Sequence, residues 1–125
     1  MDENRISGEI IGAAIEVHRI LGPGLLESTY QQCLAREFEL RRIPFRRELD
    51  IGLDQKGLAI GRAYRMDFLV FDRRVVGVKA VVAVLPVHRS QLLTCLKRSH
   101  TRLGLLINFN VPLLKSGIFR VANRE

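Results

Sequence analysis

The stretch at residues 64–80, YRMDFLVFDRRVVGVKA, places one acid and one lysine inside two segments that are rich in apolar residues. Its first half alternates and is rich in aromatic and branched residues, and its second half is apolar again after the polar break DRR, which predicts two paired strands. Asp67 lies inside the first predicted strand, and Lys79 lies near the end of the second. An ionisable group in an apolar hairpin is costly unless it is paired, binds a metal or belongs to a functional site. These two residues are therefore the first candidates for a functional site.

The length and the apolar pattern define the kind of protein to expect. A chain of 125 residues is large enough for one hydrophobic core, so residues 1–125 are predicted to form a single domain. No apolar run approaches the length needed to span a bilayer, and the N-terminal segment MDENRISGEI is too polar for a secretory signal. We therefore expect a cytoplasmic protein that does not enter a membrane.

The charge distribution indicates a polyanionic partner. The formal net charge is +7, and no acidic residue occurs between Asp72 and Glu125. This concentration of positive charge favours binding to nucleic-acid phosphates, with DNA favoured over RNA as the partner; the alternative is a solvated basic surface without a partner. Whether the chain forms a homodimer is left open. The candidate nucleic-acid-binding residues are Arg73, Arg74, Arg89, Lys97 and Arg98.

The periodicity along the chain predicts the element order ααβββαββ. Helical spacing of apolar residues alternates with short runs rich in branched residues, and a bend or bulge is expected at Gly61. The expected helices cover residues 4–21, 25–41 and 87–99, and the expected strands cover residues 45–53, 58–71, 75–83, 102–108 and 117–121. The third strand is nearly unbroken in apolar residues, as is typical of a strand covered on both faces. The order predicts an α/β fold with a mixed central sheet flanked by helices.

Several phrases of the sequence resemble a known family. Residues 24–30, GLLESTY, match the signature of the bacterial GxxExxY proteins, and the resemblance continues through IIGAAIEVHRILGPGLLE, YRMDFLV, LPVHRSQLLT and RLGLLINFNVPLLKSGIFR. That family is assigned to the PD-(D/E)XK nuclease superfamily. The resemblance implies a restriction-endonuclease-like core and the hydrolysis of phosphodiester bonds with Mg²⁺ or Mn²⁺.

The resemblance also implies which residues form the site. Glu27 matches the helical glutamate, Asp67 the strand acid, Lys79 the lysine of the E-x-K triplet and Gln91 the glutamine of a helical Q-x-x-x-Y segment. These four are the implied catalytic residues, and the implied metal ligands are Asp67, Glu27 and the backbone carbonyl of Val78. Such a set suits the chemistry, because carboxylates hold a hard divalent ion that polarises the phosphate and activates a bound water.

The chain departs from the family pattern at three positions of this site. Gly77 stands where the glutamate of E-x-K is expected, Val82 replaces a second acid, and Cys95 replaces the tyrosine of Q-x-x-x-Y. Mg²⁺ is commonly anchored by one or two carboxylates, so the missing glutamate weakens the implied site. Only Glu48 and Asp50, on the first predicted strand, are near enough in the sheet order to substitute for it.

These departures leave three functions open. The first is a degenerate nuclease domain that binds nucleic acid or a protein partner with weak or no cleavage. The second is an active Mg²⁺-dependent nuclease with a rewired ligand set, since Glu27, Asp67, Lys79 and Gln91 are present. The third is a structural or oligomerisation role, which predicts no salt-dependent affinity for nucleic acid. The sequence therefore does not decide whether the protein is an enzyme.

Overall fold

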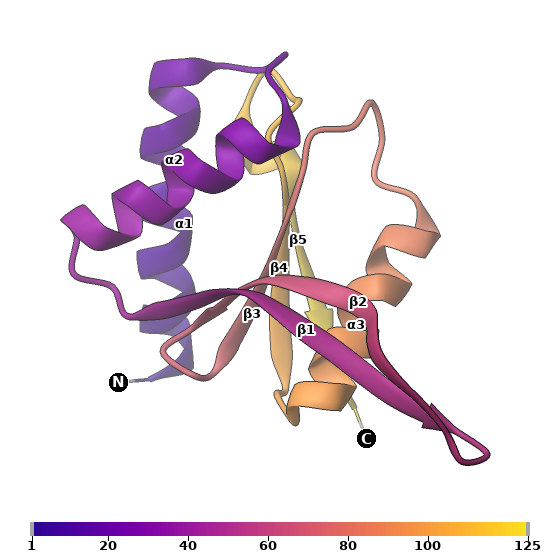
Figure 1. Cartoon of the computed structure of the whole chain (residues 1–125). Coiled ribbons are helices and arrows are strands. Elements are labelled where there is room, and N and C mark those ends of the chain that lie inside the picture. The colour runs from indigo at the N-terminus through magenta and orange to yellow at the C-terminus, as the bar shows by residue number, and fades with distance from the viewer. Residues whose placement is uncertain (1, 125) are drawn as a thin grey trace.

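The chain folds as a five-stranded mixed sheet with helices on both faces, which confirms the expected α/β class (Figure 1). The computed structural model describes residues 2–124. The elements, in chain order, are α1 (Glu3–Leu21), α2 (Glu27–Leu40), β1 (Phe45–Gln55), β2 (Leu58–Val70), β3 (Arg74–Lys79), α3 (Pro86–Ser99), β4 (Leu103–Asn108), the 3₁₀ helix η1 (Leu114–Gly117) and β5 (Ile118–Ala122). Apart from η1, this is the predicted order.

The strands lie in the sheet in the same order as in the chain, β1-β2-β3-β4-β5. Strands β3 and β4 are parallel, with Val78 opposite Ile107, and the other neighbouring pairs are antiparallel. A parallel pair needs a long crossover connection, which α3 supplies. Central strand β3 is largely buried, as its apolar sequence predicted.

Two hydrophobic cores hold the helices against the sheet. The buried stripe of α1, at Ile6, Ile10 and Val17, packs with α2 on one face of the sheet. Leu92 and Leu96 of α3 pack on the opposite face, so the helices form two separate outer layers (Figure 1). Within residues 2–124, no helix is both long enough and apolar enough to cross a membrane.

The turn between β2 and β3 covers residues 71–73, one position earlier in the chain than the predicted polar break at residues 72–74. Phe71 and Asp72 both have positive φ, and the Arg73 amide donates to the Val70 carbonyl at 3.0 Å, as in tight hairpins. Arg74 does not belong to this break. It is the first residue of β3 and is only 1% exposed.

Strand β3 ends at Lys79, four residues before the predicted end at residue 83. The side chain of Asn108, at the end of β4, explains the difference: its Oδ1 accepts a hydrogen bond from the Val81 amide at 3.0 Å, and its Nδ2 donates to the Val81 carbonyl at 2.9 Å. This side chain takes the place of a further strand residue. Beyond it the chain turns away as a loop, in which Val82 is 95% exposed.

Strands β1 and β2 form a ribbon that extends beyond the rest of the sheet (Figure 1). The pairing register shifts between Ile51 and Leu53, whose partners Tyr64 and Ile60 bracket Gly61, where the sequence predicted a bend. Side chains of this outer part are exposed, including Leu58 and Ile60. The inner part of the same ribbon carries Asp67.

Candidate active site

Asp67 lies where β2 and β3 diverge. The antiparallel pairs of these strands end at Phe68 opposite Val76, and beyond this point the Asp67 carboxylate accepts a hydrogen bond from the Val78 amide (Oδ2 to N, 2.7 Å). Its Oδ1 accepts a second hydrogen bond from Nε2 of Gln31 on α2 at 3.2 Å. Both carboxylate oxygens are therefore engaged by N–H donors.

The surroundings of Asp67 favour its protonated form. Burial raises the pKa of Asp67 to about 6, and the nearby negative charge of Glu27 adds to this rise. The hydrogen bond from Val78 and the positive charges of Lys79 and Arg47 lower the pKa, but they do not offset the burial. Asp67 consequently titrates close to neutral pH.

We expect Asp67→Asn to stabilise the protein at pH 8 and to have little effect at pH 3.5. The folded state holds the Asp67 proton up to about pH 6, whereas an ordinary aspartate loses it near 3.8. Relative to the variant, wild-type stability therefore falls as pH rises through this window and stays low above it. The gain at pH 8 should be about 1–2 kcal/mol, after allowance for water reaching a half-buried carboxylate. Urea unfolding at both pH values, with chelator present, measures it.

The control for this prediction is Asp50→Asn. Asp50 is exposed and forms ion pairs with Arg62 and Arg65, so no gain at pH 8 is expected. A gain for Asp67→Asn of the same size at pH 3.5 and pH 8 would contradict the assigned cause, because it would not depend on ionisation.

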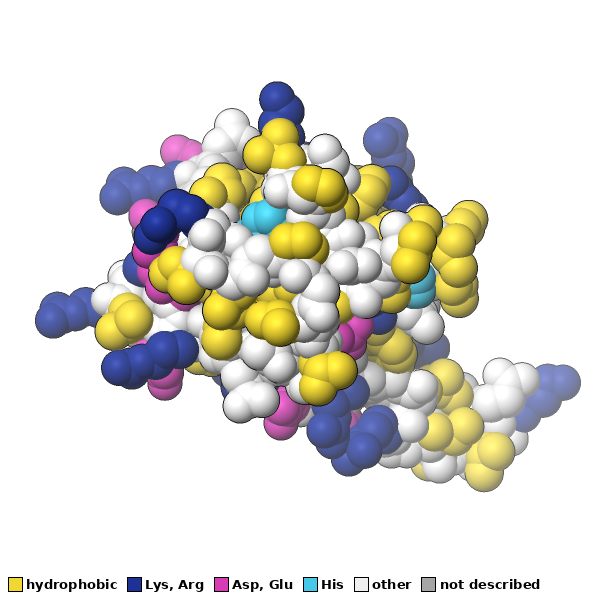
Figure 2. Space-filling model, turned by 90° about the horizontal axis from the view of Figure 1, so that it is seen from above, with side chains coloured by type: hydrophobic (Ala, Val, Ile, Leu, Met, Phe, Trp, Pro, Cys, Tyr) yellow, Lys and Arg dark blue, Asp and Glu magenta, His cyan; other side chains and the backbone are white. Residues whose placement is uncertain are grey.

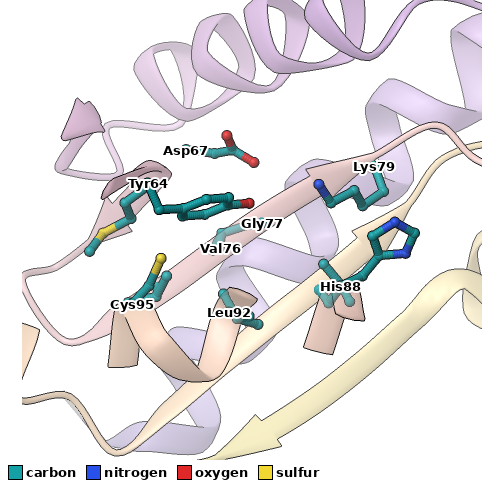
Figure 3. A pocket seen from close by; sticks show the side chains of 11 residues that line it. Tyr64, Asp67, Val76, Gly77, Lys79, His88, Leu92 and Cys95 are labelled. Atoms are coloured by element: carbon teal, nitrogen blue, oxygen red, sulfur yellow. The ribbon is translucent and has the colours of Figure 1, made fainter. Parts of the chain in front are cut away.

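Lys79 and Gly77 lie on the same face of β3 and line a narrow pocket between the sheet and α3 (Figure 3). Asp67 lines it from β2, and His88 and Cys95 line it from α3. The cavity volume is about 10 Å³, about what one water molecule requires. In Figure 3 the Lys79 amine and the Tyr64 hydroxyl point toward one another above Gly77.

Gly77 occupies the position from which a longer side chain would enter this pocket. A Cβ built on Gly77 would lie 3.2 Å from Cδ1 of Leu106 and 3.6 Å from Cδ1 of Leu92. Both neighbours are the ends of flexible side chains, so a side chain at position 77 needs only a small adjustment. The glycine leaves the pocket floor without a carboxylate next to Asp67.

Gln91 reaches the pocket through a residue that the sequence analysis missed. Its Oε1 accepts a long hydrogen bond from the Tyr64 hydroxyl at 3.5 Å. Tyr64 lines the same pocket as Cys95, and burial raises the pKa of Tyr64 to about 12. Burial likewise raises the pKa of the Cys95 thiol to about 11, so the thiol is protonated at neutral pH. The sequence signal for Tyr64 was only an aromatic residue in a strand, which is typical of core packing.

Glu27 is the first residue of α2, and the loop before it is held by Tyr30. The Tyr30 hydroxyl donates to the Gly22 carbonyl at 2.5 Å and accepts from the Leu25 amide at 3.2 Å, while its ring stacks on Phe109. This explains locally why a tyrosine follows the glycine-rich turn. Gln31, which sequence reasoning also missed, lies one helical turn after Glu27 and binds Asp67.

The basic residues singled out in the sequence do not gather around the pocket. Arg89, Lys97 and Arg98 are exposed on α3, and Arg89 lies 4.7 Å from the centroid of the Phe119 ring. Arg73 is exposed in the turn at the opposite end of β3 from Lys79. Figure 2 looks onto the face formed by the loops around residues 22–26 and 80–85, where basic side chains lie at the rim of a largely uncharged surface.

Arg74 does not have the position expected of a phosphate-binding residue. Its guanidinium group forms an ion pair with the Glu3 carboxylate and donates to the backbone carbonyls of Glu3 (3.1 Å) and Leu103 (3.3 Å). A side chain that is 1% exposed and held in this way cannot reach a phosphate. The structure therefore argues against Arg74 as part of a nucleic-acid interface.

The structure thus brings Asp67 and Lys79 together at one pocket. Glu27 acts on Asp67 through its negative charge. Gln91 is connected to the pocket by its hydrogen bond with Tyr64. The Val78 amide binds Asp67, and the role of its carbonyl stays a prediction. In residues 2–124, no group of three or more His, Cys, Asp and Glu side chains is arranged to hold a metal ion.

Comparison with known proteins gives one family match for the chain. A family model described as the PD-(D/E)XK nuclease superfamily matches residues 4–121, nearly the whole chain. No curated protein and no solved structure matches the chain significantly.

Proposed function

The chain belongs to the PD-(D/E)XK nuclease superfamily, and from this premise we propose that it is a nucleic-acid-binding domain with weak or no metal-dependent cleavage. The phrase at residues 24–30 supports its further assignment as a GxxExxY protein. The proposed partner is DNA rather than RNA.

The proposal of weak or absent cleavage rests on the acidic residues that the pocket has and lacks. Both oxygens of Asp67 accept hydrogen bonds from nitrogen donors, and position 77 has no side chain to offer a metal. Mg²⁺ requires near-octahedral coordination by oxygen, so the residues present do not fit a Mg²⁺ site as they are arranged. In a working nuclease of this kind the ion would polarise the phosphate and activate water.

The second candidate is an active nuclease with a changed set of metal ligands, and one observation favours it. The charge of Glu27 raises the pKa of Asp67, so the two carboxylates are electrostatically coupled. The other acids considered as substitutes are engaged elsewhere: Glu48 pairs with Arg47, and Asp50 pairs with two arginines of the β1–β2 ribbon. The carboxylate ligands of a metal site would therefore come from Asp67 and Glu27.

The proposed binding surface is the outer side of α3. Arg89, Lys97 and Arg98 project from it, and the chain carries no acidic residue between Asp72 and Glu125 to oppose them. Long exposed basic side chains along a helix can follow a phosphate backbone without reading its sequence.

Fluorescence anisotropy with labelled DNA and RNA tests the proposal. We expect DNA binding whose affinity falls steeply with salt concentration. Changing Arg89, Lys97 and Arg98 together to Gln should reduce the slope of log affinity against log salt by about 2–3. The matched control changes Arg5, Arg36 and Arg42 to Gln, which removes the same charge from exposed positions at the other helices and should leave the slope nearly unchanged.

Incubating the same DNA with Mg²⁺ or Mn²⁺ separates the two candidates. Weak or absent nicking agrees with the proposal. Robust nicking that Asp67→Ala abolishes would replace it with the rewired nuclease. Absence of salt-dependent binding to either nucleic acid would refute both and leave a structural role.

A further inference from the structure

The hydroxyl of Tyr64 enters the pocket from strand β2, whereas the family resemblance implies a tyrosine on helix α3. On α3, position 95 carries a thiol, although the resemblance implies a tyrosine there. Tyr64 on β2 lines the same pocket as Cys95, and its hydroxyl lies 3.5 Å from Oε1 of Gln91, one helical turn before Cys95. A hydroxyl beside Gln91 is therefore present, but it comes from the sheet.

The Tyr64 hydroxyl is suited to donate a hydrogen bond to an anion. Burial and the negative charges of Asp67 and Glu27 keep it protonated, with a pKa of about 12. Its contact with Gln91 is at the long limit for a hydrogen bond, so the hydroxyl loses little when it exchanges that contact for a charge-assisted bond to an anionic oxygen. The Lys79 amine points toward the same hydroxyl (Figure 3).

The size of the cavity restricts what can bind between these groups. A volume of about 10 Å³ admits a single oxygen atom but not a whole phosphate group. A phosphate lying at the mouth of the pocket could place one non-bridging oxygen inside it, between the Lys79 amine and the Tyr64 hydroxyl. Lys79 supplies the charge and Tyr64 a directed O–H donor.

We propose that Tyr64 replaces, from β2, the hydroxyl that α3 lacks at Cys95, and that with Lys79 it binds one phosphate oxygen of the nucleic acid. This inference rests on the proposed nucleic-acid binding and identifies the group that the pocket recognises. It makes Tyr64 a substrate-positioning residue, whereas a residue that only fills the core would act through its ring alone.

Tyr64→Phe separates these two roles, because phenylalanine keeps the ring and removes the hydroxyl. We expect this variant to bind labelled DNA about tenfold more weakly in the absence of divalent ions, with an unchanged melting temperature to within a few degrees. Unchanged DNA affinity would overturn the inference while leaving the proposed nucleic-acid binding intact.

Exchanging the two side chains gives a matched test. Tyr64→Cys alone should bind DNA at least about tenfold more weakly than wild type, and Tyr64→Cys combined with Cys95→Tyr should recover to within about threefold, since the hydroxyl returns beside Gln91 from the helix. A folded double variant that binds no better than Tyr64→Cys would count against the inference.

Titration with inorganic phosphate, followed by NMR of the Gln91 side-chain amide, decides the inference without nucleic acid. We expect phosphate to shift this resonance in wild type, because the Tyr64 hydroxyl leaves Gln91, and to shift it much less in Tyr64→Phe. If wild type binds no DNA but shows this difference, the proposed function fails and the phosphate site stands. Equal shifts in both proteins would overturn the site.

Discussion

Gly77→Glu is expected to create a Mn²⁺ site with an affinity at least about 10-fold above that of the wild-type protein. The introduced carboxylate would enter the pocket that Asp67 and Lys79 line, where a second oxygen ligand is missing. Adding a carboxylate that binds the metal directly should matter at least as much as the groups that hydrogen-bond to metal ligands, whose loss typically costs about 10–100-fold in metal affinity. Titration calorimetry with Mn²⁺ measures the difference directly.

Gly77→Gln is the matched control, since it has nearly the same shape without the charge. It meets the same Leu106 and Leu92 methyl groups, so any effect of crowding is shared by both variants. Equal Mn²⁺ affinity in the two variants would show that the carboxylate is not a ligand. No gain in either would contradict the placement of position 77 beside the metal. Nicking of DNA by the glutamate variant alone would show that only this ligand had been lost.

Gly117→Ala is expected to destabilise the protein by about 3 kcal/mol. A Cβ at this position would overlap the backbone oxygen of Asn108 and would lie 3.1 Å from Cγ2 of Val111. The first contact is with backbone and cannot be relieved by a rotamer change, so strand β4 or η1 must move. Asn108 holds the Val81 backbone, and displacing it should also loosen the loop that follows Lys79.

Gly61→Ala is the control for this prediction. No atom lies within 4 Å of a Cβ built at Gly61, and its φ is not in the left-handed region. We expect its free energy of unfolding to change by less than about 1 kcal/mol. Chemical denaturation of the three proteins provides the comparison, and a loss below about 1 kcal/mol for Gly117→Ala would contradict the close approach at Asn108.

Periodicity predicted the elements because it reflects which face of each element is buried. The spacing of Ile6, Ile10 and Val17 follows the buried side of α1, and the apolar run from Val75 follows a strand covered on both faces. The same rule failed at Val82, where an apolar residue is almost fully exposed in a loop. Composition alone cannot distinguish a buried valine from an exposed one.

The contacts that the sequence could not predict join residues far apart in the chain. Arg74 looked like part of a basic surface, because nothing nearby indicates its ion pair with Glu3, 71 positions earlier. Gln31 and Tyr64 had ordinary positions on a helix and in a strand, and only the divergence of β2 from β3 brings them to the site. Asp67 and Lys79 were recognisable because charge is unusual in apolar strands.

The order of strands in the sheet has a consequence for how the protein folds. Each strand lies beside its neighbours in sequence, so the β1–β2 and β2–β3 hairpins close short loops. The parallel pairing of β3 with β4 requires a long crossover connection. Loop-closure entropy therefore favours formation of the two hairpins early in folding and pairing of the parallel strands later. The pocket lies between the β2–β3 hairpin and α3, so it is assembled at the final docking step and is among the first parts to open when that helix detaches.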